Sequence, residues 1–175
     1  MIVDWSIWQP RERATLCFIT EADRILLIHK KRGLGAGKIN APGGKIDPDE
    51  TALEAAVRET IEEVGVTPLA PEARGELFFQ FVDGYSLHCT VFLANDFTGE
   101  LIETAEALPV WAPRNAIPFD QMWADDRHWL PLMLAGHRFV GRFVFAGDTM
   151  LSKEIETVGE PANVPVAVAG ACVTS

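Results

Sequence analysis

The 175-residue sequence predicts one α+β domain, a mixed β-sheet packed between α-helices. Three observations predict it: paired strand patterns at both ends of the chain, one strongly patterned helix at residues 48–64, and a composition that is 48% hydrophobic. That length and composition suit a single sizeable core. We find no internal repeat and no sign of a second domain.

The strand patterns come in pairs. Residues 14–30 contain two apolar runs around a polar turn, and residues 75–96 contain two more around Asp83-Gly84, a dipeptide that favours a hairpin. One further strand is expected near residues 108–113, and residues 137–158 can form a last antiparallel pair.

A second helix is expected within residues 122–136, where Pro131 predicts a late start or a kink. The domain is expected to span residues 14–158, after an N-terminal extension at residues 1–13. Residues 159–175 are small, Pro-containing and unpatterned, so a flexible C-terminal tail is expected there.

The first helix has clear end signals. Asp47 is expected to cap it, with Pro48 in the first turn and Glu50 completing a capping box, and Gly65 to end it. An apolar stripe is expected to pack on the core and consists of Leu53, Ala56, Val57, Ile61 and Val64.

Three acids, Glu59, Glu62 and Glu63, crowd the last turns of this helix on the opposite side. Like charges at this spacing repel, and anions oppose the helix dipole at a C-terminus. Arg58 offsets only part of the repulsion. A solvated acidic face is one interpretation. The other is a hard divalent cation such as Mg²⁺, which binds through carboxylates, waters and substrate phosphates.

Charge and composition limit the partners. A net charge of −10 argues against binding long nucleic acid, although a metal can still neutralise the phosphates of a nucleotide. No apolar run is long enough to span a membrane, and residues 1–18 lack the features of a signal peptide. Cys17, Cys89 and Cys172 are scattered, which fits a reducing compartment. A cytoplasmic, monomeric protein with a small-molecule substrate is expected.

The glycine-rich segment KKRGLGAGK, residues 30–38, is not a phosphate-binding P-loop. Gly33 to Gly37 is one residue short, and Ile39 replaces the required Ser or Thr. A solvated basic turn and a loop that touches phosphates both remain open. Lys30, at a predicted strand end, is a candidate partner for a phosphate or a carboxylate.

The first helix and its flanks resemble the Nudix box. The matching residues keep the family spacing and are Gly43, Gly44, Glu50, Arg58, Glu59, Glu62, Glu63 and Gly65. The one departure is Thr60, which stands where the family has a bulky apolar residue. The resemblance implies a Nudix fold and hydrolysis of a nucleoside diphosphate linked to another group, with Mg²⁺ as the cofactor and Mn²⁺ as the alternative.

This resemblance implies a ligand set of Glu59, Glu62 and Glu63 with the carbonyl of Gly43. It assigns Glu50 and Arg58 to orienting that shell. The sequence leaves the general base open between Glu63, Glu59 and an outside carboxylate, for which Glu106 is the best candidate.

From about Ala14 to Val158 the chain is similar to the MutT-homologue family of 8-oxo-dGTPases, in stretches such as KKRGLGAGKINAPGGK and IPFDQMWADDRHWLPLML. This resemblance implies that Glu106 lies near the metal. It also implies a purine held by Asn40, Trp123, Asp125 and Asp126, in a pocket lined by Thr15, Leu16, Leu34 and Phe79. Leu34 and Ile39 replace aromatic residues of that family.

These residue types suit a purine. Trp123 offers a flat face for stacking, and Asn40 can both donate and accept hydrogen bonds. Two adjacent carboxylates facing one base should share a proton, so that one accepts and the other donates. Taken alone, Asp125-Asp126 is also typical of a helix N-terminal cap.

The function expected from these features is Mg²⁺-dependent hydrolysis of oxidised purine nucleoside triphosphates. Such an enzyme would convert 8-oxo-dGTP, and also 2-oxo-dATP or methylated purine dNTPs, to the monophosphate and pyrophosphate. The alternatives are a Nudix hydrolase of ADP-ribose or of a dinucleoside polyphosphate, and a non-catalytic Nudix ligand sensor.

Overall fold

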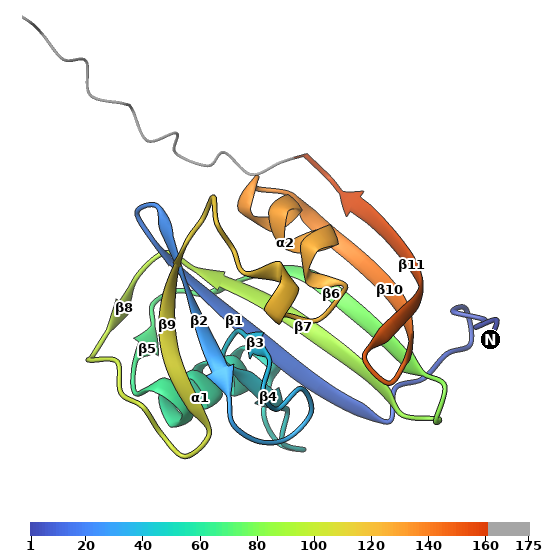
Figure 1. Ribbon diagram of the computed structural model, residues 1–175, viewed down its shortest axis with the longest axis horizontal. Helices are drawn as coiled ribbons and strands as arrows, with labels where there is room; N and C mark the ends of the chain where they lie inside the picture. The colour runs from blue at the N-terminus through green and yellow to red at the C-terminus, as the bar shows by residue number, and fades with distance from the viewer. Residues whose placement is uncertain (161–175) are drawn as a thin grey trace, which may run out of the picture.

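The computed structural model describes residues 1–160, which form a mixed β-sheet with two α-helices (Figure 1). The strands of the large sheet are β1 (Glu12–Glu21), β2 (Arg24–Lys30), β3 (Ile39–Asn40), β4 (Gly43–Lys45), β6 (Glu72–Phe81), β7 (Ser86–Ala94), β9 (Ala107–Pro113), β10 (Arg138–Ala146) and β11 (Thr149–Val158). The helical elements are α1 (Ala52–Val64), a 3₁₀ turn η1 (Phe119–Gln121) and α2 (Asp126–Leu134). The predicted α+β fold is confirmed.

The sheet has the neighbour order β11-β10-β6-β7-β1-β2-β3, with β4 also pairing β1 and β9 also pairing β2. Strand β1 runs parallel to β7, and β6 runs parallel to β10. The three predicted hairpins, β1–β2, β6–β7 and β10–β11, are confirmed as antiparallel pairs. A separate small pair joins β5 (Thr67–Pro68) to β8 (Phe97–Thr98).

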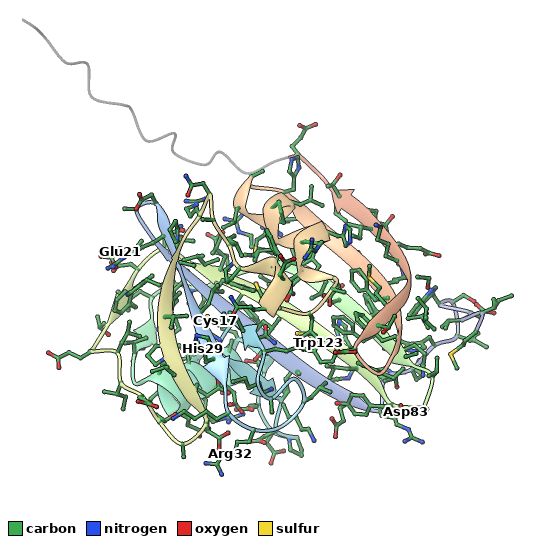
Figure 2. The ribbon with its side chains drawn as sticks, viewed as in Figure 1. Cys17, Glu21, His29, Arg32, Asp83 and Trp123 are labelled. Carbon is green, nitrogen blue, oxygen red and sulfur yellow. The ribbon has the colours of Figure 1, made fainter. Side chains whose placement is uncertain are left out.

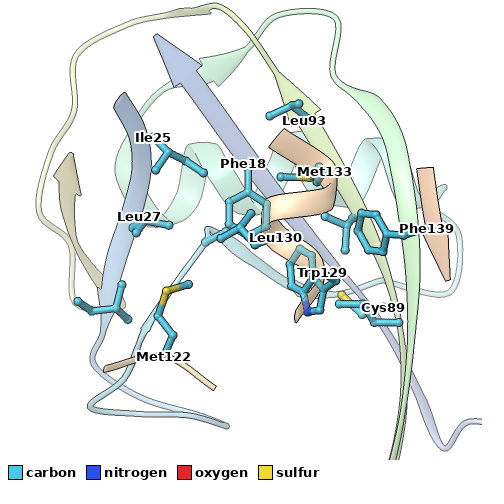
Figure 3. Close-up of a cluster of buried hydrophobic side chains, with 14 of the residues drawn as sticks. Phe18, Ile25, Leu27, Cys89, Leu93, Met122, Trp129, Leu130, Met133 and Phe139 are labelled. Atoms are coloured by element: carbon cyan, nitrogen blue, oxygen red, sulfur yellow. The ribbon is translucent and has the colours of Figure 1, made fainter. Parts of the chain in front are cut away.

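The two helices cover opposite faces of the sheet. On one face, Phe18 of β1 and alternate residues of β2 pack against Trp129, Leu130 and Met133 of α2 (Figure 3). The intervening residues of the same two strands, such as Ile19, point to the other face and pack against Val64 at the end of α1. Period-two alternation along β1 and β2 therefore places a helix on each side, as predicted.

Helix α1 starts later than predicted. Its N-cap is Thr51, whose hydroxyl accepts a 3.1 Å hydrogen bond from the Glu54 amide, while the Glu54 carboxylate accepts from the Thr51 amide. The predicted cap at Asp47 is wrong, because residues 47–50 form a turn in which the Asp47 amide donates to the Glu50 side chain. The predicted end is confirmed, since Gly65 takes the left-handed conformation with φ 79°.

The predicted apolar stripe of α1 is only partly correct. Leu53 and Ile61 are 44% and 43% exposed, and the helix is instead buried through Ala55, Ala56, Thr60, Glu63 and Val64. Small residues on this side let the helix pack closely on Cys17 and Phe92. The hydroxyl of Thr60, at the bulky position of the box, donates to the Ala56 carbonyl and so needs no other partner.

Helix α2 begins at Asp126, a late start as predicted, and contains Pro131. No helix within residues 1–160 is long and apolar enough to cross a membrane. Strand β1 begins at Glu12, two residues before the predicted start of the domain. The predicted flexible tail lies almost wholly outside the described residues.

Candidate active site

A pocket opens between the start of β1, the short strands β3 and β4, the facing residues of β6 and β7, and the start of α2. Its empty volume, counted out into the open solvent, is about 740 Å³. Nine of the residues that line it are the predicted substrate-binding set: Thr15, Leu16, Lys30, Leu34, Asn40, Phe79, Trp123, Asp125 and Asp126. Gly43 and Glu63 line it as well.

Two glycines of β4 allow close packing beside this pocket, Gly43 against β1 and Gly44 against α1. A Cβ on Gly43 would collide with the backbone of Thr15, and one on Gly44 would collide with the carboxylate of Glu59. In the β1–β4 pairing, hydrogen bonds join Ile46 to Arg13 and Cys17 to Pro42. Because such bonds alternate in antiparallel pairs, Gly43 directs its amide and carbonyl away from β1. The amide donates to Glu63 over 3.2 Å.

Glu63 is the box glutamate that faces the pocket, and its side chain is buried. Burial raises the pKa of Glu63 to about 7, with the charges of Glu59 and Glu106 adding to the shift, while the Gly43 amide and Lys30 oppose it. Burial also raises the pKa of Glu59, against the lowering effect of Arg58. A bound cation would therefore stabilise the ionised form of both carboxylates, which burial disfavours.

Arg58 ties α1 to the turn before it. Its guanidinium donates to both Glu50 oxygens at 2.9 and 2.5 Å and to the Lys45 carbonyl at 3.1 Å. This pairing lowers the pKa of Glu50 to about 2. Arg58 also contacts Glu59 at 2.9 Å and Glu62 at 3.3 Å. Glu62 is exposed and lies on the Arg58 side, away from the pocket residues.

Glu106 is exposed and pairs with Arg32 at 3.2 Å. Within residues 1–160, no three His, Cys, Asp or Glu side chains are already arranged around a metal position. The groups beside β4 could hold Mg²⁺. They are the carboxylates of Glu59 and Glu63 and the Gly43 carbonyl, which points away from β1. Mg²⁺ commonly takes one or two carboxylates and completes its shell with water and phosphate oxygens.

The far end of the pocket holds two buried acids. Asp125 accepts a 2.8 Å hydrogen bond from the Trp129 indole, but its second oxygen, like one oxygen of Asp126, has no partner within the described chain. Burial raises the pKa of Asp125 to about 6, and burial with the charge of Asp125 raises the pKa of Asp126 well above its ordinary value. Asp125 occupies the N-cap position of α2 without a capping bond, so the capping interpretation is wrong.

The remaining predicted residues also line the pocket. The side-chain oxygen Oδ1 of Asn40 accepts a hydrogen bond from the Ala41 amide. The side-chain NH₂ group of Asn40 is therefore left to donate to a ligand. The hydroxyl of Thr15 is buried without a partner in the described chain. Leu34 is 44% exposed at the rim. Figure 2 shows Trp123 near the centre of the molecule and Arg32 on the loop that follows β2.

Comparison with known proteins shows the family of this chain. The family model described as NUDIX domain matches residues 10–133. The chain belongs to the Nudix family. It is 42% identical over 146 residues to the oxidized purine nucleoside triphosphate hydrolase of Danio rerio, covering 82% of this chain and 94% of that protein. The protein of the same name from Mus musculus is 38% identical over 146 residues, with the same coverage.

A solved structure has the same fold as this chain. The crystal structure of the MutT protein from Bacillus halodurans superposes with a TM-score of 0.75 at 29% identity, covering 83% of this chain and 97% of that one.

This Nudix domain also lines its pocket with residues that sequence reasoning missed. They lie on β6 and β7 and include Leu77, Phe81, Leu87 and Cys89. The register pairs Leu77 with Cys89 and Phe79 with Leu87, so all of these side chains project from one face. Because side chains alternate along a strand, Leu77 and Phe81 could have been found in the sequence as the residues two positions before and after Phe79, which was predicted to line the pocket.

Proposed function

We propose that this Nudix protein is a Mg²⁺-dependent pyrophosphohydrolase of oxidised purine nucleoside triphosphates, 8-oxo-dGTP first, that releases the monophosphate and pyrophosphate. The observation that carries the proposal is one pocket with two chemically distinct ends: buried Asp125 and Asp126 at one, and Glu63 beside Gly43 at the other. The names of the relatives from Danio rerio and Mus musculus support the same substrate class.

The acid pair supports the choice of a purine. Asp125 ionises more readily than Asp126, because the Trp129 indole donates a hydrogen bond that stabilises the negative charge of Asp125. Asp126 then keeps the shared proton. An ionised Asp125 can accept from a ring N–H or an exocyclic amine, and a protonated Asp126 can donate to a carbonyl oxygen. Moving the proton would reverse these roles, which extends the substrates to 2-oxo-dATP and methylated purine dNTPs.

At the other end, Glu63 is our choice of general base over Glu59 and Glu106, because it is the one of the three that lines the pocket. In the metal-free protein burial raises its pKa to about 7, and a carboxylate oxygen that the cation does not occupy can take the proton of an attacking water. Arg58 holds Glu59 in place, and Lys30 adds positive charge beside Glu63. Mg²⁺ held by Glu59, Glu63 and Gly43 would neutralise phosphate oxygens and acidify a bound water. Mn²⁺ is the expected substitute.

The substrate class can be tested by pyrophosphate release. The panel contains 8-oxo-dGTP, 2-oxo-dATP, O6-methyl-dGTP, dGTP, dATP and ADP-ribose, each assayed with Mg²⁺ and with a chelator. We expect metal-dependent turnover that prefers a modified purine over dGTP and dATP. Equal turnover of modified and normal dNTPs, or activity on ADP-ribose alone, would overturn the proposal. A monomeric, cytoplasmic enzyme is part of the same proposal, and sedimentation and cell fractionation test it.

Replacing Glu63 by Gln distinguishes a catalyst from a ligand sensor. The amide keeps the shape but cannot take a proton, so we expect kcat to fall by about 10²- to 10³-fold. Affinity for 8-oxo-dGMP, measured without metal, should change little because the acid pair is untouched. Glu156→Gln, at an exposed site on β11, is the matched control. Unchanged turnover in Glu63→Gln would remove Glu63 as the base.

A further inference from the structure

The glycine-rich loop after β2 closes on itself and reaches toward the purine end of the pocket. The Lys30 amide donates to the Lys38 carbonyl over 3.0 Å, and the Gly37 amide donates to the Lys30 carbonyl over 2.8 Å. Lys38 therefore leaves the loop from a fixed backbone position. Its ammonium lies 3.4 Å from a carboxylate oxygen of Asp148, in the turn between β10 and β11.

The same ammonium lies over Trp123, 5.2 Å from the centre of its ring. The loop backbone also touches the indole, because a Cβ on Gly35 would come within 2.7 Å of Trp123 Nε1. Phe81 and Phe145 contact the indole at steep angles, with ring centres 6.2 and 5.5 Å away. Trp123 thus meets cationic, backbone and aromatic neighbours from three separate parts of the chain.

Trp123 lines the pocket, whereas Lys38 is absent from the lining that the described residues form. The ammonium therefore lies over the indole without forming part of that pocket wall. The Trp123 carbonyl also accepts a 3.2 Å hydrogen bond from the Asp126 amide. The backbone of Trp123 is therefore hydrogen-bonded into the turn that carries the acid pair.

We propose that Lys38, held by Asp148, is a positioning residue that fixes the Trp123 ring over the pocket and so sets the affinity for the base. The nature of the base rests on the proposed function, but the positioning of Trp123 does not. Attraction between a cation and an indole face supplies the force, and the ion pair with Asp148 keeps the cation in place.

The first test needs no ligand. In protein labelled with 5-fluorotryptophan, the ¹⁹F resonance of Trp123 is assigned by its loss in Trp123→Phe. We expect Lys38→Met, which keeps the length of the side chain, to shift or broaden that resonance, and Lys38→Arg to leave it close to the wild-type position. Lys153→Met removes a lysine from β11 as the charge control. A Trp123 resonance that is the same in Lys38→Met and wild type would overturn the proposal.

The second test measures binding and turnover. Lys38→Met should weaken binding of 8-oxo-dGMP without metal by about 2- to 10-fold and raise KM by a similar factor, with kcat within about twofold of wild type. Lys38→Arg should restore both, and Asp148→Asn should show a smaller effect in the same direction. A fall in kcat with unchanged KM would contradict the proposal. A shifted Trp123 resonance in a protein that hydrolyses no oxidised dNTP would leave the positioning role standing and remove the proposed substrate.

Discussion

At the scale of single residues, the buried acid Asp125 should make stability depend on pH. Its pKa is raised to about 6 in the folded chain, against about 3.9 when unfolded. Between about pH 4 and pH 6 the folded state binds the extra proton, so stability from this group is full below pH 4 and is lost as pH rises through 6. The Asp125→Asn variant does not lose this stability as pH rises, because an amide does not ionise. We expect the variant to gain about 1 to 3 kcal/mol over wild type between pH 4 and pH 7.

Urea unfolding without metal, at intervals from pH 4 to pH 7.5, measures this difference. Asp49→Asn removes an exposed acid and should track the wild-type curve. Parallel curves for Asp125→Asn and wild type would show that Asp125 ionises normally. The amide variant should bind 8-oxo-dGMP more weakly, so that stability is gained where function is lost.

Residue types in the site could be predicted, but their environments could not. The spacing of Glu59, Glu62 and Glu63 indicated a cluster on one helix face, and the structure separates it: Glu63 is buried and Glu62 is exposed beside Arg58. The difference depends on how α1 packs against β4, where Gly44 leaves room for the Glu59 carboxylate. A helical pattern alone does not contain that information.

At the scale of elements, the start of α1 can be tested by comparing two candidate caps. Thr51 forms a complete capping box with Glu54, whereas the Asp47 side chain does not cap the helix. Thr51→Ala should lower the free energy of unfolding by about 1 kcal/mol, and Asp47→Ala should lower it by less than half as much. Chemical denaturation of both variants checks this. A larger loss in Asp47→Ala would restore the cap predicted from sequence.

Long elements were predictable because their patterns are long. The three hairpins, the strand at Ala107–Pro113 and the late start of α2 all follow from alternation, turn residues or Pro131. The strands β3, β4, β5 and β8 have two or three residues each, too few to show a period. Two of them, β3 and β4, carry Asn40 and Gly43, so the least predictable elements hold part of the site.

At the scale of the whole molecule, the pocket joins residues from Thr15 to Asp126 that no local spacing relates. The resemblance to a known family brought these residues together, and alternation along β6 and β7 adds Leu77, Leu87 and Cys89. The N-terminal extension was given no role from sequence. In the structure, Trp8 donates a 2.8 Å hydrogen bond to Gln80 and packs edge-on against Phe78 of β6.

That contact predicts a separation of stability from activity. Phe78 points to the face of β6 opposite to Phe79, which lines the pocket, so Trp8 packs away from the substrate. Trp8→Ala should lower the free energy of unfolding by about 1 to 3 kcal/mol, with kcat and KM for 8-oxo-dGTP unchanged below the unfolding transition. Trp5→Ala is the control, because Trp5 contacts Trp8 only at a tilted angle, with ring centres 5.5 Å apart, and its loss should cost less. A loss of activity in folded Trp8→Ala would show that this face of the sheet communicates with the pocket.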